Sequence, residues 1–193
     1  MTKRTIPKKK LKPVPRMQQP KIDWRKVLSK QTKAVLIDEL VELIEDDRRL
    51  ARRLALRFHV ESPPGALVQE TRQAIAEATE YDPREMNYNF DYDYAAYQTV
   101  EKNFGKMIKA GDLAAAMDLA LELMKSGSEQ VEMSDEGLMT GDIEDCLRVV
   151  LAAMKSADLP AETQRTWAKN MQRADRIDCI CDEELQDLAK VKE

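Results

Sequence analysis

The sequence is poor in the residues that most enzymes use for covalent or acid–base catalysis. Its 193 residues include one histidine, His59, and three cysteines. A Ser-His-Asp or Cys-His site needs a base that further groups hold in place, and no second feature supports one around His59. The phosphate-cradling patterns GxxxxGK(S/T) and GxGxxG are also missing. We therefore predict no catalytic residue and no cofactor, with His59 at a helix end or in a loop.

The cysteines are too few for a disulfide framework. An odd number without framework spacing is typical of a reducing compartment, so we expect a cytoplasmic protein. Cys179 and Cys181 form a CxC pair, but a tetrahedral zinc site needs four ligands. Only Cys146 and His59 are left to complete the set, and Cys146 falls on the apolar face of a predicted helix. The pair therefore predicts no zinc site.

A calcium loop fails on its spacing. Residues 128–142 combine five acids with two glycines, which predicts a loop, and loop carboxylates bind hard cations. With Gly137 at position six of an EF-hand, Glu132 takes position one and Ile143 takes position twelve. Isoleucine cannot supply the bidentate carboxylate that position twelve needs. We therefore predict no metal site in this segment.

Long apolar runs and strand-forming segments are scarce. No run approaches the roughly 20 apolar residues of a membrane-spanning helix, and the N-terminus lacks the apolar core of a secretory signal. Glycine and proline are few, at six and eight, whereas Ala, Leu, Glu, Lys, Arg and Met are plentiful. This composition favours an all-α protein.

Positive charge is concentrated at one end of the chain. Residues 1–33 carry twelve Lys or Arg and one acid, which leaves nineteen Lys or Arg and 34 Asp or Glu for residues 34–193. Residues 1–30 are predicted to be a flexible, proline-containing arm. The arm could touch phosphates, anionic lipid or an acidic protein, or it could be a solubilising tail that folds onto its own acidic body. Its candidate contact residues are Lys8, Lys9, Lys10, Lys12 and Arg16.

Residues 104–124 predict an αα-hairpin. Gly111 suits the left-handed position after a helix, and Asp112 can cap the N–H groups of the next helix. Beyond Asp112, apolar residues recur at spacings of three and four, and Gly127 is predicted to end the second helix. These residues are Leu113, Ala116, Met117, Ala120, Leu121 and Met124.

Further helices are predicted on both sides of this hairpin. Asp46 and Asp142 are the predicted caps of the helices at 47–58 and 142–156, and the helix at 31–45 is expected to pair antiparallel with 47–58. The arginines of 47–58 would form a solvated face or meet a partner. The predicted ranges are 31–45, 47–58, 65–80, a helix ending before Gly111, 142–156, one that starts at Leu159 and presents Trp167, Met171 and Ala174 to a neighbour, and 182–191.

One segment gathers half of the aromatic residues. Residues 87–97 hold five of the ten, beside several carboxylates. They could form a binding patch for a peptide, or they could close a gap between helix pairs, because buried aromatics fill cores efficiently. The candidate partner-binding residues are Tyr88, Phe90, Tyr92, Tyr94 and Tyr97, with Asp135 and Glu136 from the acidic loop.

The order of these features resembles the α-helical repeat region associated with bacterial SWIM zinc-finger proteins. The likeness rests on the helix pair at 36–58, ALVQETRQAI at 66–75, the tyrosines at 92–97, KMIKAGDLAAAMDLALELM at 106–124, SDEG at 134–137 and a final Trp-containing helix. The finger itself, CxC followed by CxH, is absent, so its metal and nucleic-acid roles are not carried over. The resemblance implies a solenoid-like fold and an adaptor role without catalytic residues.

Together these features predict an all-α protein of seven or eight helices, stacked as antiparallel hairpins in the manner of TPR or HEAT repeats. A basic arm, 1–30, precedes a single acidic domain, 31–193. The predicted function is a non-enzymatic protein–protein interaction module that binds another protein or peptide. The alternative is a nucleic-acid-associated accessory protein held through residues 3–33, whose binding would weaken steeply with salt.

Overall fold

The computed structural model describes residues 22–58, 66–82, 84, 92–134 and 140–190. Within these ranges the chain is all-helical, without a strand, which confirms the predicted fold class. The described residues form nine helices: α1 (Trp24–Leu28), α2 (Lys33–Asp46), α3 (Arg48–Arg57), α4 (Leu67–Ala78), α5 (Tyr94–Lys109), α6 (Leu113–Met133), α7 (Gly141–Ser156), α8 (Ala161–Ala174) and α9 (Asp182–Ala189). The short α1 was not predicted. None of the helices in these ranges is long and apolar enough to cross a membrane.

The chain divides into two compact units, Met1–Glu42 and Leu43–Glu193. In the first, Asp23 caps α1 by accepting a hydrogen bond from the Lys26 amide at 3.1 Å. Helix α2 crosses the boundary between the units at Leu43, and neither α1 nor α2 contains a buried residue. The predicted antiparallel pairing of α2 with α3 joins the two units, and it stays a prediction.

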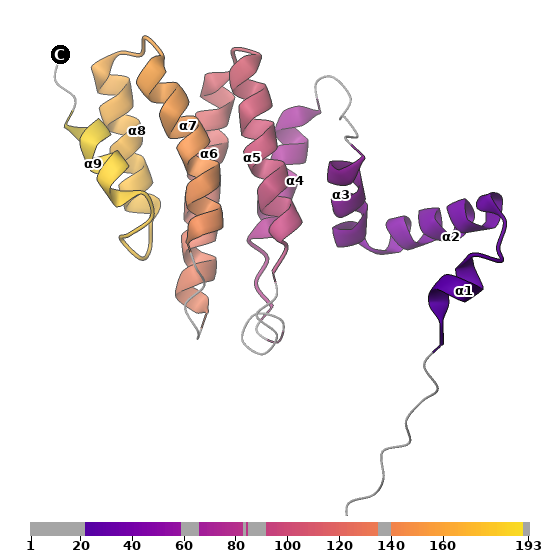
Figure 1. The fold of residues 1–193 in the computed structure, drawn as a ribbon. Helices are drawn as coiled ribbons and strands as arrows, with labels where there is room; N and C mark the ends of the chain where they lie inside the picture. The colour runs from indigo at the N-terminus through magenta and orange to yellow at the C-terminus, as the bar shows by residue number, and fades with distance from the viewer. Residues whose placement is uncertain (1–21, 59–65, 83, 85–91, 135–139, 191–193) are drawn as a thin grey trace, which may run out of the picture. The chain divides into compact units, whose positions relative to one another are not determined.

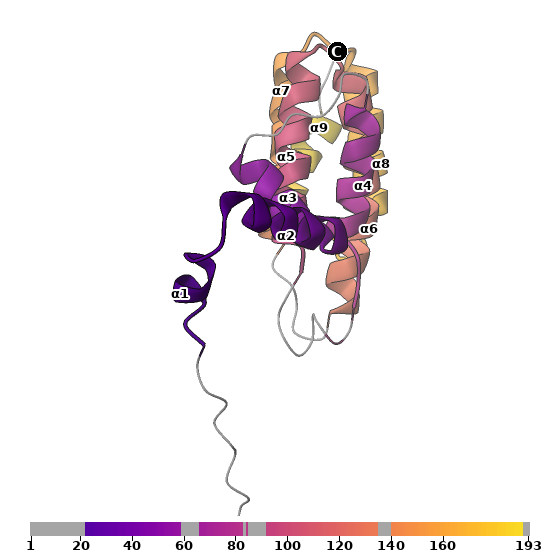
Figure 2. The same ribbon diagram turned by 90° about the vertical axis from the view of Figure 1, so that its right-hand side faces the viewer.

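Helices α4 to α9 of the second unit pack side by side in two layers (Figures 1 and 2). Helices α4, α6 and α8 form one layer, in which α6 contacts both neighbours, and α5 and α7 lie side by side in the other. Contacts between α4 and α5, α6 and α7, and α8 and α9 join helices that follow one another along the chain. Helix α3 packs against α5.

The predicted apolar faces form the core of this unit. Cys146 is buried on the apolar face of α7 as predicted, together with Ile143, Leu147, Val150, Leu151 and Met154. Trp167 and Met171 of α8 and Leu185 and Leu188 of α9 are buried as well. Four residues of the predicted α6 stripe are buried, Ala116, Met117, Ala120 and Met124, while Leu113 and Leu121 are partly buried. Helix α6 lies between neighbours in both layers, so it also buries Leu119 and Leu123.

The α5–α6 turn has the predicted geometry. Gly111 has φ of +82°, and the Asp112 and Gly111 amides donate to the carbonyls of Met107 and Ile108 at 2.9 and 3.0 Å. This pair of bonds is the Schellman motif, which satisfies the last carbonyls of α5. Asp112 Oδ1 accepts from the Ala115 amide at 3.2 Å and so caps α6.

The prediction that Gly127 ends α6 is wrong. Helix α6 continues to Met133, so the start of the predicted loop at 128–142 is helical, and Gly127 is buried within the helix. A Cβ atom at Gly127 would lie 2.8 Å from Cδ1 of Ile143 in α7. Glycine is therefore present because α7 approaches closely, and not because the backbone turns.

Two predicted helix caps are displaced. The Asp47 carboxylate, rather than Asp46, caps α3 by accepting from the Leu50 amide at 3.0 Å. Helix α7 begins at Gly141, so Asp142 lies in its first turn and not at the cap. Asp142 is instead the acceptor for the hydroxyl of Tyr92.

Candidate functional site

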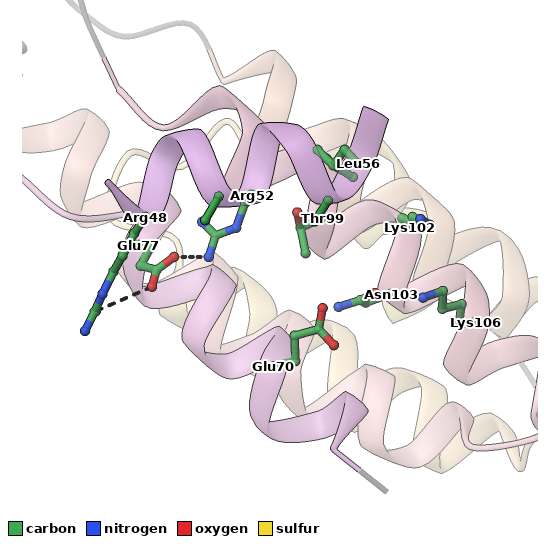
Figure 3. Close-up of a pocket in the computed structure, with 11 residues that line it drawn as sticks. Arg48, Arg52, Leu56, Glu70, Glu77, Thr99, Lys102, Asn103 and Lys106 are labelled. Carbon is green, nitrogen blue, oxygen red and sulfur yellow. Dashed lines mark hydrogen bonds and ion pairs between the residues drawn. The ribbon is translucent and has the colours of Figure 1, made fainter. Parts of the chain in front are cut away.

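A pocket of about 300 Å³ lies between α3, α4 and α5 in the second unit (Figure 3). Four basic and two acidic side chains line it, together with a small apolar wall from α3. We call it the α3–α5 pocket, and its lining residues are Arg48, Ala51, Arg52, Ala55, Leu56, Glu70, Glu77, Thr99, Lys102, Asn103 and Lys106.

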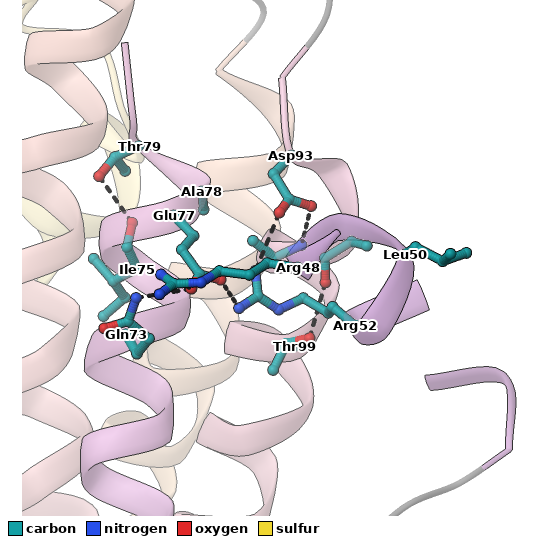
Figure 4. A network of polar contacts seen from close by, with 12 residues as sticks. Arg48, Leu50, Arg52, Gln73, Ile75, Glu77, Ala78, Thr79, Asp93 and Thr99 are labelled. Atoms are coloured by element: carbon teal, nitrogen blue, oxygen red, sulfur yellow. Dashed lines mark hydrogen bonds and ion pairs between the residues drawn. The ribbon is translucent and has the colours of Figure 1, made fainter. Parts of the chain in front are cut away.

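Arg52 fixes the α3 side of this pocket (Figure 4). Its guanidinium hydrogen-bonds to Glu77 of α4 and, at 3.2 Å, to Asp93, which caps α5 by accepting from the Ala96 amide. The side chains of Arg52 and Glu77 are each 14% exposed. Burial lowers the pKa of Arg52, while the Asp93 carboxylate opposes that shift. The sequence interpretation placed Arg52 among arginines that form a solvated face or meet a partner, whereas in the structure it belongs to a partly buried network within the protein.

Lysines of α5 continue the positive charge beyond the pocket. Lys102, Lys106 and Lys109 follow one another at spacings of four and three, which places them on one face of the helix. We call these three residues the lysine row. All three also line an adjoining shallow groove of about 520 Å³, whose floor includes Gly105 and, from α7, Val149. The basic lining therefore extends along α5 past the pocket.

Asn103 is the unusual residue of the pocket. It is 1% exposed, and its side-chain nitrogen Nδ2 has no hydrogen-bond partner, the one such buried atom among the described residues. Figure 3 shows Asn103 and Lys106 reaching from α5, and Glu70 from α4, toward the space between the helices. A buried amide donor without an acceptor costs about 1–3 kcal/mol. This cost marks Asn103 as a residue that folding alone does not explain.

The polar residues of the pocket differ in how far the protein already satisfies them. Thr99 donates to the Ala95 carbonyl at 2.9 Å, and Glu77 accepts from Gln73 at 2.7 Å in addition to Arg52. Neither Lys102 nor Lys106 forms an ion pair in the part of the chain that the structure describes. The unused polar capacity therefore consists of donors and positive charge.

The tyrosines of the predicted aromatic patch differ in their exposure to solvent. Tyr97 is 3% exposed and donates to Gln130 Oε1 at 2.8 Å, and Tyr92 meets its ring edge-on with centroids 5.9 Å apart. Burial raises the pKa of both phenols. This packing supports the gap-closing alternative for Tyr92 and Tyr97. Tyr94, in contrast, is 53% exposed at the start of α5.

The other predicted contact residues lie outside the described ranges. They are Tyr88, Phe90, Asp135, Glu136, Lys8, Lys9, Lys10, Lys12 and Arg16. His59 lies outside these ranges as well.

The cysteines do not gather at a metal-binding geometry. Cys146, Cys179 and Cys181 are all free, and within the described ranges no group of three or more His, Cys, Asp or Glu could hold a metal ion. Burial raises the pKa of Cys181 to about 12 and also raises the pKa of Cys146.

Two sequence signals pointed to this site without being used. Asn103 interrupts the apolar stripe of Val100, Phe104 and Met107, and the lysine row has helical spacing within an otherwise acidic body. Neither signal revealed that α3 and α4 would complete a pocket, because that depends on tertiary packing. No family model, curated protein or solved structure matches the chain.

Proposed function

We propose that the protein is a non-enzymatic interaction module that docks a segment of another protein on α5, at the α3–α5 pocket and the lysine row. The observation that carries the proposal is a basic, partly apolar hollow on a body with an excess of acids. Residues 34–193 hold 34 Asp or Glu against nineteen Lys or Arg, yet four bases and two acids line the pocket. A local field of sign opposite to the body selects and orients an anionic partner.

The architecture supports the same proposal. Layers of antiparallel helices give a rigid platform, and we propose that they are repeats of a solenoid like the region associated with SWIM zinc fingers. Side chains from three helices line the pocket, so it depends on the packed unit rather than on one flexible loop. We further propose that the module acts in the cytoplasm, where its free thiols persist.

Capture of partners from the native cell tests this function. The full chain, the double variant Lys102→Glu/Lys106→Glu and the control Lys125→Glu/Lys169→Glu would each serve as bait for quantitative mass spectrometry. The control lysines are exposed on α6 and α8 and lie away from the pocket lining. We expect a set of proteins that the wild type and the control retain and that the pocket variant loses. Equal retention by all three baits would reject the pocket face as the docking surface.

A second candidate function rests on the charge asymmetry of the chain. Twelve Lys or Arg within residues 1–33 could neutralise nucleic-acid phosphates. Replacing Lys8, Lys9, Lys10, Lys12 and Arg16 by Gln should then weaken binding to DNA or RNA at low salt and flatten its salt dependence. Absence of nucleic-acid binding by the unmodified chain at low salt would remove this candidate.

A further inference from the structure

We infer that the α3–α5 pocket receives a single anionic side-chain group from an acidic peptide segment, with Asn103 Nδ2 donating to its oxygens and Lys102 and Lys106 neutralising its charge. This inference rests on the proposed function and names the chemistry of the partner.

Asn103 requires an oxygen acceptor. Its Nδ2 is buried and unpaired in the free protein, whereas the nearby polar groups Thr99 and Glu77 already have partners. A ligand oxygen is the group that would satisfy this donor. Ionised carboxylate and phosphate oxygens accept hydrogen bonds, and these charged hydrogen bonds are stronger than those of neutral groups.

The charge around Asn103 favours an anion. Lys106 lies three residues after Asn103 and Lys102 lies one residue before it, and both half-buried side chains line the same pocket. The Arg52 guanidinium is already engaged by Glu77 and Asp93, and Arg48 pairs with Glu77 at 3.7 Å, so the two lysines supply the uncommitted positive charge. Partial burial strengthens their attraction for an anion relative to lysines in open water.

The size and the apolar wall of the pocket match a group the size of one side chain. A volume of about 300 Å³ is at the lower end of ligand pockets, too small for a folded element. Ala51, Ala55 and Leu56 of α3 offer an apolar surface for the methylene groups that carry the anion. The groove along the lysine row then gives the flanking acidic residues of the peptide a path across α5.

Glu70 allows a test of whether the ligand is an anion or a cation. It also lines the pocket, and its negative charge repels an anion. If the ligand is anionic, Glu70→Gln should tighten binding several-fold. If the pocket instead accepts a cation, the same substitution should weaken binding.

The anionic group could be a Glu or Asp carboxylate or a phosphorylated serine. Three probes distinguish these sources: acetyl-(Glu)6-amide, the same peptide with one phosphoserine at its centre, and inorganic phosphate. Acetyl-(Gln)6-amide controls for uncharged peptide.

The experiment titrates each probe into the ¹⁵N-labelled full chain and follows the side-chain amide signal of Asn103, with calorimetry for affinity. We expect (Glu)6 or its phosphoserine form to shift the Asn103 signal and (Gln)6 to leave it in place. Asn103→Leu should weaken binding at least about tenfold, because a charged hydrogen bond is lost. Lys102→Gln/Lys106→Gln should weaken it similarly, and the surface control Lys125→Gln/Lys169→Gln should not.

Three results would overturn the inference: an unmoved Asn103 signal with every anionic probe, weaker binding by Glu70→Gln, or equal binding by the Lys102→Gln/Lys106→Gln variant and its control. The Lys102→Gln/Lys106→Gln variant tests the inference even if Asn103→Leu misfolds. If cellular partners depend on the pocket lysines but anionic probes leave Asn103 unmoved, the docking function stands and the ligand chemistry is wrong. If the probes bind and no cellular partner depends on the pocket, the docking function fails.

Discussion

Two buried amide side chains show how differently the fold treats similar chemistry. Asn103 Nδ2 has no partner, whereas Gln130 is fully used: its Nε2 donates to the carbonyls of Ala78 and Glu80 at 2.9 and 3.2 Å, and its Oε1 accepts from Tyr97. Gln130 thereby ties α6 to the end of α4 and to α5. We therefore expect the Asn103 amide to lower the stability of the fold and the Gln130 amide to raise it.

Replacing each amide by leucine should therefore change stability in opposite directions. Asn103→Leu removes an unpaired polar group and should raise stability by about 1 kcal/mol, or about 2–4 °C in Tm. Gln130→Leu leaves a hydroxyl and two carbonyls unpaired and should lower stability by about 2–3 kcal/mol. Urea unfolding of both variants measures the difference. Destabilisation by Asn103→Leu would mean that Asn103 supports the free fold.

The thiols provide a second prediction at this scale. Cys146 and Cys181 are buried with raised pKa values, about 12 for Cys181, while Cys179 is exposed. One thiol should react rapidly with Ellman's reagent at pH 8 in the native protein and three after denaturation. Because a raised folded-state pKa penalises ionisation, stability should fall as pH rises above about 9, the unfolded thiol value. Rapid reaction of all three native thiols, or urea midpoints unchanged from pH 7 to 10.5, would contradict the described burial.

At the scale of elements, the α6–α7 contact depends on one glycine. Gly127→Ala gains about 1 kcal/mol of helix propensity but forces Ile143 aside, and overpacking costs about 1–3 kcal/mol. We expect a net loss of about 1 kcal/mol in urea unfolding. Ile143→Val removes the atom nearest to the new methyl group, so the double variant should lose less than the sum of the two single variants.

Gly105 is the matched control for this prediction. It also lies inside a helix, but beyond its chain neighbours and the adjacent helix backbone no atom lies within 4 Å of a Cβ added there. Gly105→Ala should therefore raise stability by about 0.5–1 kcal/mol through helix propensity alone. A gain of the same size at Gly127 would show that α6 and α7 are not closely packed at that point.

For the whole molecule, the division into two units predicts how the chain responds to truncation. The described residues before Leu43 are all non-buried, so the second unit gains no core residue from them. A chain beginning at Leu43 should keep a single cooperative transition with Tm within about 2–4 °C of the full chain, the shift that about 1 kcal/mol produces at this size. Loss of that transition on truncation would show that the first unit completes the core.

The sequence predicted features that depend on neighbouring residues better than features that depend on contacts between helices. The Gly111–Asp112 turn follows from local capping signals, the placement of Cys146 on an apolar helix face follows from local periodicity, and both are confirmed. The prediction for Gly127 failed because the sequence alone does not distinguish a glycine that permits close helix packing from a glycine that ends a helix. The α3–α5 pocket could not be predicted because its lining spans residues 48–106 and exists only after three helices pack.

Arg52 couples the packing of α3 against α4 and α5 to ligand binding in the α3–α5 pocket. Helix α3 has no buried residue. The ion pairs of Arg52 with Glu77 of α4 and with Asp93, the cap of α5, hold this wall of the pocket in place. Docking of this wall and occupation of the pocket are therefore coupled equilibria, and such coupling is reciprocal. An occupant would slow the hydrogen exchange of α3 amides, and loosening α3 would lower the occupant's affinity. Hydrogen exchange of the α3 amides would thus show whether the pocket is occupied, independently of the Asn103 signal.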